Sequence, residues 1–489
     1  MPRAIFCRRY ALRKGDGMSK KSGIFLSIAA AISIAVAQNA AEIQSESRNP
    51  GDLIIRHHAY GHFEAGQIGS GHIKQDDIST NANQYAIDHV WSENAIVGLG
   101  LEALYREHFK MAFGLNTKLY FSYPQFLDHD RYTKNMRQDV FIDDVYAQYF
   151  RGNEIAPLVS LQMGYFKFKY DPDIRNLGEY LFRSGTYPAF LDNSFDFPQQ
   201  RLLGFHGQSN LFNSLKTDLL FVSQTVFPAM NWSLAGLAEY DVAGRRFLTI
   251  GAGVDFAHLF DVYTHHSFPA SGGDPTELHS DVNARYIAKV SAAGDTTLEY
   301  YTFKGTKVMG RIAFDPKAFI SWKGFGRSDL RLYAEVCVIG LKSYPDSGYI
   351  QGGTYTLVAP SYDKIPEKTP VVIGFNIPTF KILDVFNCEV EYFGARYYND
   401  ASSTINKGSN PLPYNVFDYF SNPLAPKKND YKWSVYVKRT LFDGHFAIIG
   451  QVARDHMRLP CAQYDLEYWN DLLVTKDDWW WVLKTSWMF

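Results

Sequence analysis

Residues 479–489 read WWWVLKTSWMF, and this stretch decides how the rest of the chain is interpreted. Every second residue from Trp479 to Phe489 is apolar or aromatic apart from Thr485, while the alternate set carries the only charge, Lys484. A period of two is typical of a β-strand with one apolar face. Such a strand needs an apolar medium on that side, either a protein core or a lipid, and the rest of the sequence must distinguish the two.

The same alternation recurs in stretches that are long for strands. Residues 109–121 keep apolar side chains on one face and polar or small ones on the other over 13 residues. A strand in a globular protein is more often five or six residues long, whereas an oblique crossing of a bilayer takes about 9–11. Residues 246–256, 330–340 and 386–392 repeat the pattern, with charged and small residues opposite the apolar face. The pattern therefore favours strands that cross a membrane.

Eighteen stretches fit this pattern, and their connections alternate in length. Long connections mostly follow the odd-numbered strands and short turns mostly follow the even-numbered ones, with the longer turn at 317–329 as the exception. This sorting is typical of a bacterial outer-membrane barrel, which has short periplasmic turns and longer external loops. The candidate strands are residues 53–66, 94–104, 107–122, 139–151, 157–169, 201–209, 215–227, 231–242, 245–257, 284–293, 296–303, 306–316, 330–343, 370–379, 385–397, 431–440, 445–457 and 479–489.

Closure follows from the hydrogen-bonding needs of the backbone. Past the N-terminal region the sequence has no run of 18 apolar residues, so no transmembrane helix is expected. In lipid every backbone N–H and C=O must be paired, and a sheet meets that condition only when it closes on itself. We therefore predict an all-β protein, a transmembrane antiparallel up-and-down barrel of about 18 strands, with 16 as the alternative. The barrel is expected over residues 53–489 as one domain.

The N-terminal region has the layout of a secretory signal. Two lysines (Lys20 and Lys21) precede an apolar run over residues 24–36, and cleavage is expected after Ala37. Met18 is the preferred start, with residues 1–17 as an extension or a long basic n-region, and residues 38–52 are expected to be a short periplasmic segment. Residues 1–37 hold seven of the 49 Lys and Arg and one of the 51 Asp and Glu, so the remainder has 42 basic and 50 acidic residues. Its net charge of −8 disfavours nucleic acid as a partner.

Two stretches resemble those of bacterial porins. The aromatic strand that ends at Phe489, with Trp487, is similar to the C-terminal signature of outer-membrane barrels, and implies recognition by the outer-membrane assembly machinery after export. Residues 142–170, IDDVYAQYFRGNEIAPLVSLQMGYFKFKY, resemble a hairpin of the phosphate- and sugar-type porins. The resemblance implies localisation in the outer membrane of a Gram-negative bacterium, contact with its lipid, and a homotrimer. Beyond this hairpin the chain departs from the family pattern, so no solute is carried over.

A long loop after the hairpin is the candidate constriction. Thirty structureless residues in a compact fold are unusual unless they have a function, and in the porins that this hairpin resembles the following loop folds into the pore. We predict that residues 170–200 enter the barrel, where rings of charge select solutes. An ordinary surface loop with solvated charges is the alternative. The loop charges are Asp171, Asp173, Arg175, Glu179 and Arg183, and the expected wall residues are Lys110, Lys118, Glu335, Glu389 and Lys484.

Other site chemistries receive little support from the sequence. His58 and His62 share a strand face about 13 Å apart at about 3.3 Å per residue, too far to bind one metal ion. We interpret residues 56–66 as part of the lumen wall, and no cofactor is expected. Serines and histidines are scattered and no GxSxG occurs, so an enzyme is not expected.

The predicted function is passive diffusion of small hydrophilic solutes through a water-filled, loop-narrowed channel, with a weak preference for cations. The alternative is an outer-membrane anchor, receptor or adhesin that binds carbohydrate or surface ligands through tyrosine-rich external loops such as residues 343–363.

Overall fold

The computed structural model describes most of the predicted strands and several of their connections. Residues Pro50–Met488 form one compact unit. The predicted signal peptide over residues 1–37 and the segment 38–52 lie outside the described residues, as does most of the external loop 343–363. The described ranges are 53–74, 84–86, 91–122, 137–154, 156–183, 191–192, 199–212, 214–223, 232–242, 247–260, 285–290, 296–301, 305–320, 322–341, 347–351, 354–358, 364–394, 431–455, 472–473 and 477–489.

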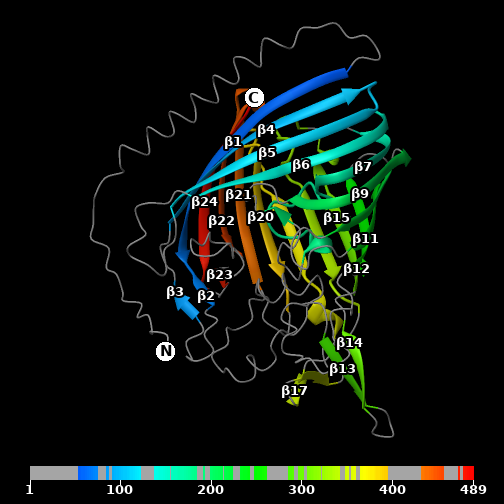
Figure 1. Ribbon diagram of the computed structural model, residues 1–489. Coiled ribbons are helices and arrows are strands. Elements are labelled where there is room, and N and C mark those ends of the chain that lie inside the picture. Colours follow the sequence, from blue (N-terminus) through cyan, green and yellow to red (C-terminus); the bar gives the residue numbers. More distant parts are fainter. Residues whose placement is uncertain are drawn as a thin grey trace, which may run out of the picture. The chain divides into compact units, whose positions relative to one another are not determined.

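Sixteen antiparallel strands close into a barrel (Figure 1). Consecutive barrel strands pair with each other, and β1 pairs with both β4 and β24, so the sheet closes on itself. The architecture is that of a bacterial outer-membrane β-barrel. Its strands are β1 (Leu53–Ser70), β4 (Trp91–Tyr105), β5 (Phe109–Ser122), β6 (Arg137–Gly152), β7 (Pro157–Phe168), β9 (Gln199–Phe212), β10 (Leu215–Ser223), β11 (Trp232–Asp241), β12 (Leu248–Phe260), β15 (Gly305–Phe314), β16 (Leu332–Val338), β19 (Val371–Asn376), β20 (Val385–Tyr392), β21 (Tyr431–Leu441), β22 (Phe446–Arg454) and β24 (Trp479–Met488).

The strand count of 18 is wrong, and the alternative of 16 is confirmed. The predicted strands 284–293 and 296–303 form β13 (Arg285–Val290) and β14 (Thr296–Tyr301), which pair with β17 (Ser347–Gln351) and β18 (Thr354–Val358) in a separate four-stranded sheet. β14 pairs with β13, and β13 pairs with β18, so within the described residues this sheet is separate from the barrel wall. β13 and β14 belong to the connection between β12 and β15, so removing them leaves the up-and-down order unchanged.

Shorter elements complete the description. β2 (His72–Lys74), β3 (Gln84–Ala86) and β23 (Leu472–Leu473) form a three-stranded sheet, and β8 (Leu191–Asp192) adds to the edge of β9. Four short 3-10 turns are described: η2 (Tyr180–Phe182), η6 (Pro316–Phe319), η7 (Ile365–Lys368) and η8 (Phe442–Gly444). No helix in the described part of the chain has the length and apolar character needed to cross a membrane.

The apolar and polar residues that alternate in the sequence lie on the outer and inner faces of the barrel wall, respectively. On β24, Trp480, Val482 and Lys484 are buried toward the lumen, whereas Trp479 and Leu483 are exposed on the outside. The same holds around the barrel, where large apolar side chains stay exposed on the outward face of successive strands. Examples are Leu101, Phe113, Leu161, Leu219, Ile250, Val308, Ile373 and Val390. An apolar exterior of this extent is the lipid-facing belt of a transmembrane barrel.

The depth of this belt can be tested with one charge at two positions. Leu219 lies in the middle of β10, 59% exposed, and Leu53 lies at the end of β1, 56% exposed. Arginine on the lipid face costs about 2–4 kcal/mol at the midplane and about 0–1 kcal/mol near the interface. We therefore expect Leu219→Arg to lower the free energy of unfolding by about 2–4 kcal/mol and Leu53→Arg by less than about 1 kcal/mol, measured by urea titration in lipid vesicles. Equal costs at both positions would contradict the assignment of β10 to the hydrocarbon.

Candidate functional site: a loop held inside the barrel

Two facing glycines let the chain leave the barrel wall after β7. Gly164 and Gly204 pair across β7 and β9, with φ of 133° and 153°. A Cβ atom would lie 2.3 Å from the Val145 carbonyl oxygen at Gly164 and 2.2 Å from the Phe221 carbonyl oxygen at Gly204, so larger residues do not fit. The pairing of β6 with β7 ends at Tyr165, while the pairing of β7 with β9 continues to Phe168. The ends of β7 and β9 therefore separate from β6, and residues 169–183, here called the inner loop, follow.

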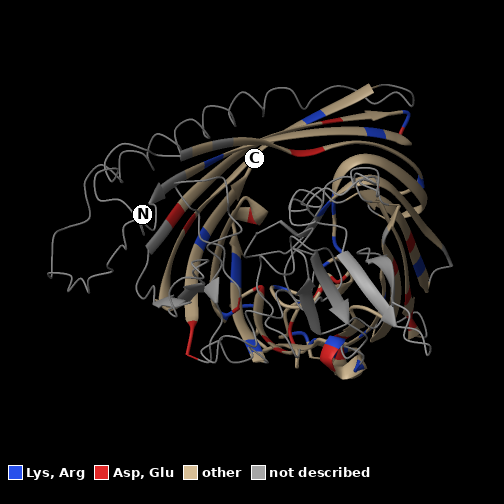
Figure 2. Cartoon of the chain, turned by 60° about the horizontal axis from the view of Figure 1, so that its bottom comes forward, with Lys and Arg blue, Asp and Glu red and all other residues tan. Residues whose placement is uncertain are grey.

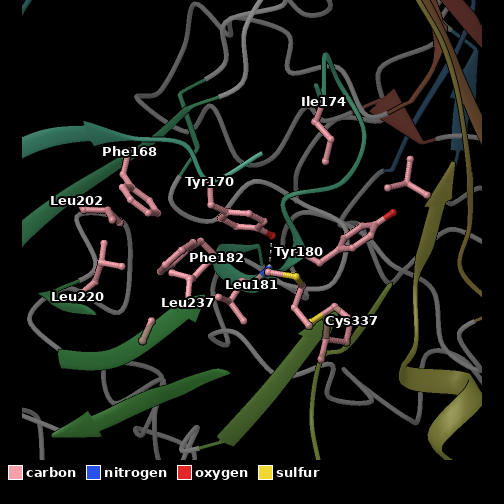
Figure 3. Close-up of a cluster of buried hydrophobic side chains, with 14 of the residues drawn as sticks. Phe168, Tyr170, Ile174, Tyr180, Leu181, Phe182, Leu202, Leu220, Leu237 and Cys337 are labelled. Carbon is pink, nitrogen blue, oxygen red and sulfur yellow. Dashed lines mark hydrogen bonds between the residues drawn. The ribbon is translucent and has the colours of Figure 1, made fainter. Parts of the chain in front are cut away.

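The inner loop packs against the lumen-facing side of the wall. Ile174, Leu177 and Tyr180 are fully buried. Figure 3 shows Tyr170, Leu181 and Phe182 among wall side chains from several strands. The apolar wall residues of this cluster are Phe166, Phe168, Leu202, Leu220, Val222, Ala235, Leu237, Met309, Ala313, Tyr333, Cys337 and Val372. Removing apolar surface from water is favourable by about 25 cal/mol per Å². The loop is therefore part of the folded core.

Two carboxylates of the wall hold the backbone of the inner loop. Glu389 on β20 accepts hydrogen bonds from the backbone N–H groups of Arg175 (2.6 Å), Asn176 (2.8 Å) and Leu177 (2.9 Å). Glu335 on β16 accepts from the N–H groups of Glu179 (3.0 Å) and Tyr180 (2.8 Å). Charge-assisted hydrogen bonds are roughly twice as strong as neutral ones. Both side chains are almost fully buried, so these bonds fix the path of the loop.

Tyrosine hydroxyls donate further hydrogen bonds to these carboxylates. Tyr333 donates to Glu389 at 2.5 Å, and Tyr170 donates to Glu335 at 2.7 Å. Tyr180 reaches a third carboxylate, Glu391, at 2.7 Å, which also pairs with Lys432 at 2.8 Å. Each buried carboxylate is therefore surrounded by donors.

Three cations of the wall bind the carbonyl and carboxylate groups of the same loop. The Lys307 ammonium donates to the carbonyl oxygen of Leu181 at 3.1 Å and also contacts that of Arg183. Arg311 pairs with Asp171 at 3.2 Å. Arg331 pairs with Asp173 at 2.6 Å. The loop is thus held through its N–H groups by anions and through its oxygen atoms by cations.

The predicted loop residues all lie within the inner loop. Asp171, Asp173, Glu179 and Arg183 are at most 5% exposed and have protein partners: Glu179 accepts from the N–H of Asp171 at 2.6 Å, and Arg183 donates to the carbonyl of Asn176 at 2.7 Å. Arg175 is half-buried over the Tyr436 ring, 5.9 Å from its centroid. Of the predicted wall residues, Glu335 and Glu389 face the loop directly.

The other predicted wall residues lie away from the loop. Lys484 on β24 pairs with Glu64 on β1 at 3.3 Å, and the charge of Lys118 on β5 acts on the same carboxylate. Lys110 lies at the end of β5 that joins the short turn to β4, 2.6 Å from Glu102 and 3.3 Å from Glu154. The ten predicted residues therefore form three groups.

One of these groups sits at a short turn and has a defined charge state. Glu154, in the turn between β6 and β7, accepts hydrogen bonds from Arg56 at 2.9 Å and from Lys110 at 3.3 Å. Burial alone would raise the pKa of Glu154, but these two cations outweigh burial and lower the pKa. Glu154 therefore remains a carboxylate at neutral pH.

A second polar cluster occupies the wall where β7 departs from β6. A β-bulge at Gly114 and Leu115 leaves Asp143 as an extra residue in β6, so Asp143 and Asp144 both turn toward the lumen. Asp143 binds Lys167 at 2.5 Å and Arg201 at 2.7 Å, and it accepts from the hydroxyl of Tyr60. Charged residues of both signs are interspersed along the strands of the barrel (Figure 2).

The residues missed by the sequence reasoning have a recognisable signal. Lys307 and Arg311 occupy the face of β15 opposite Val308 and Ile312, so their parity alone places them in the lumen. Arg331 precedes β16. Lys167 follows Gly164 and Arg201 precedes Gly204, so both lie on the strand ends that have left the wall, where parity no longer distinguishes lumen from lipid. The lumen interpretation of residues 56–66 is consistent with the inward contacts of Tyr60 and Glu64. Within the described ranges no three His, Cys, Asp or Glu side chains form a group that could bind a metal ion.

Known proteins are similar to this chain in architecture only. No protein-family model matches the chain, and no curated protein matches it. Solved structures include OprB of Pseudomonas putida, determined at high pH, with a TM-score of 0.44, 8% identity, and coverage of 89% of this chain and 94% of that chain. The outer-membrane channel DcaP of Acinetobacter baumannii has a TM-score of 0.41 and 10% identity, covering 91% and 99%. An anion-selective porin from Comamonas acidovorans has a TM-score of 0.39 and 8% identity, covering 90% and 100%. At these TM-scores and identities the likeness carries no information about the solute.

Removing one loop-binding carboxylate should weaken the whole barrel. Glu389→Ala leaves three backbone N–H groups and the Tyr333 hydroxyl without their acceptor, and each buried unsatisfied donor costs about 1–3 kcal/mol. We expect the free energy of unfolding in vesicles to fall by at least about 3 kcal/mol. The matched control is Glu102→Ala. The Glu102 side chain is 23% exposed and pairs with Lys110 at the rim of the barrel, so we expect the free energy of unfolding to fall by less than about 1 kcal/mol. If the two variants unfold alike, Glu389 does not hold the loop.

Proposed function

We propose that this chain is a porin-like outer-membrane channel for passive diffusion of small hydrophilic solutes, narrowed by the inner loop. The observation that carries the proposal is a closed 16-strand barrel with an apolar exterior and a charged interior into which a loop is fixed. Barrels of 16–18 strands enclose an aqueous channel. An interior of paired charges suits a water-filled lumen better than an apolar cargo.

The position of the inner loop supports a narrowed path. Its apolar side packs against the inner wall from β9 to β19. The opposite wall, formed by β24, β1, β4, β5 and β6, carries Glu64, Lys484, Asp144 and Lys118. Solutes would pass between this wall and the loop. Asp171, Asp173, Arg175, Glu179, Arg183, Glu335 and Glu389 would then set the position of the constriction, while Lys110, Lys118 and Lys484 would contribute to the field along the path.

Assembly of the barrel belongs to the same proposal. Trp487 lies in β24, which pairs with β1 to close the sheet, and Phe489 follows it. We expect both residues to act as the signal for the assembly machinery. A homotrimer, lipid as the surrounding medium and the absence of enzymatic activity are further expectations.

A receptor or adhesin role is favoured by one observation. The connections β12–β15 and β16–β19 contribute β13, β14, β17 and β18 to a folded sheet of their own. An ordered sheet on the side of the long connections could present a binding surface. This alternative predicts a barrel that inserts but does not conduct.

Single-channel recording in planar bilayers separates the two functions. For the full chain we expect stepwise openings whose conductance scales with bulk salt, because a water-filled path carries ions of both signs. A correctly folded barrel that stays silent would favour the receptor. As a control for folding, the same preparation should show heat-modifiable migration in gel electrophoresis.

The charges beside the kink should influence ion preference in opposite directions. Lys167 is 32% exposed and Asp144 is half-buried on the lumen side. Lys167→Gln removes a positive charge and should shift the reversal potential in a salt gradient toward cation preference, whereas Asp144→Asn should shift it toward anion preference. A shift of the same sign in both variants, or none in either, would place this cluster outside the conducting path.

A further inference from the structure

The turn between β15 and β16 forms an exposed aromatic surface at the short-turn end of the barrel. At residues 315–331 it is long for that end. It exposes Phe319 (69%) and Trp322 (54%), and the neighbouring turn between β19 and β20 exposes Phe380 (51%) and Ile382 (73%). Side chains of this kind are normally buried. Trp322 and Phe380 are in contact, with ring centroids 5.3 Å apart, so the two turns meet. The four exposed residues of these turns, Phe319, Trp322, Phe380 and Ile382, are here called the aromatic platform.

The platform is rigid, because one buried carboxylate joins its two turns. Asp329 is 1% exposed and accepts from the backbone N–H of Gly326 at 2.8 Å in its own turn. It also accepts from the N–H of Phe380 at 3.1 Å and from the hydroxyl of Thr379 at 3.2 Å in the other turn. Phe380 and Lys381 both have positive φ, of 55° and 68°. Non-glycine residues seldom adopt that region, so the surroundings hold Phe380 in a backbone conformation that it would not favour by itself.

The platform continues the lipid-facing belt. Phe319 packs on Phe247, with centroids 5.3 Å apart, and on Phe314, at 6.3 Å. Phe314 ends β15 on the same face as Val308 and Ile312, which are exposed on the outside of the barrel. The turn therefore folds against the outer surface at the strand ends. That position is the membrane–water interface, where aromatic rings with both apolar and polar surroundings are favoured.

The two turns of the platform carry three exposed cations. Lys323, Arg327 and Lys381 are exposed on the same two turns. Within the described part of the chain none of the three pairs with a carboxylate. The nearby acids have other partners: Asp315 pairs with Lys317 at 3.0 Å, and Asp384 accepts from the backbone N–H of Thr440 at 2.5 Å. The surface therefore offers three cations beside an apolar patch at membrane depth.

We propose that the aromatic platform, with Lys323, Arg327 and Lys381, is a binding site for anionic phospholipid headgroups of the inner leaflet. The rings would contact the glycerol and upper acyl region, and the cations would bind the phosphate. A cation near an anionic surface contributes about 1 kcal/mol, which corresponds to about a fivefold change in affinity. The site lies outside the lumen and is independent of solute transport.

Native mass spectrometry of the full chain in detergent tests the proposal, with equal amounts of phosphatidylglycerol and phosphatidylcholine as probes. We expect the wild type to retain phosphatidylglycerol preferentially, and the Lys323→Gln, Arg327→Gln, Lys381→Gln triple variant to lose about tenfold to a hundredfold of that preference. Arg106→Gln is the matched control, because Arg106 lies 5.1 Å from the exposed Tyr105 ring in another short turn. This control should behave as wild type.

Several outcomes would overturn the proposal. They are a wild type without lipid preference, a triple variant that keeps the preference, and an Arg106→Gln variant that loses it equally. Inorganic phosphate should not displace the lipid, because it cannot contact the rings, and displacement by phosphate would assign the site to a free anion. Trp322→Ala should weaken retention of both lipids. Conductance should be unchanged in all variants, which separates a failure here from a failure of the channel.

Discussion

The requirement that backbone polar groups stay paired in hydrocarbon determines the architecture of this protein. A membrane interior offers no water to bond an unpaired N–H or C=O group, so the sheet must close. Closure depends on the pairing of β1 with β24, which joins Tyr60 to Met488 and runs to Ser70 and Trp479. The aromatic residues of β24 serve the same requirement, because they present an outer face that hydrocarbon can solvate while Lys484 turns inward to Glu64. The alternation of apolar and polar residues and the closure of the sheet both follow from the hydrocarbon that surrounds the barrel.

The backbone polar groups of the inner loop must also be paired, and side chains of the wall pair them. Residues 169–183 form little regular structure, so their backbone groups need partners from the wall. Glu335 and Glu389 supply acceptors to five N–H groups, and Lys307 supplies a donor to the carbonyl groups. Charged side chains are costly to bury unless they are fully bonded. Here the buried charges and the irregular backbone satisfy each other, which explains why the loop charges have protein partners instead of pointing freely into water.

The sequence predicted most of the fold because period-two alternation is a local signal that lipid imposes on every spanning strand. It failed at β13 and β14, whose apolar character resembles that of spanning strands although they form a separate sheet with β17 and β18. The loop charges and the parity of Glu335 and Glu389 could be predicted, because strand parity fixes which face a residue occupies. Their pairing could not, since it depends on where the loop lies in three dimensions. Arg201 and Lys167 escaped for a different reason. They keep the parity of the outward-facing residues, but beyond the glycine pair the ends of β7 and β9 leave the wall, so this face meets Asp143 instead of lipid.

The kink also leaves backbone groups of β6 without a strand partner, and side chains replace it. When β7 leaves β6 after Tyr165, the backbone of β6 at Asp143 loses the neighbour that would bond it. Arg201 replaces that neighbour, because its guanidinium donates to the Asp143 carbonyl oxygen at 3.1 Å and to the Asp143 carboxylate at 2.7 Å. Lys167 binds the second carboxylate oxygen. The bulge that turns Asp143 inward is what brings its carboxylate within reach. Where the inner loop enters the barrel, this ion-pair cluster replaces the hydrogen bonds between the strands.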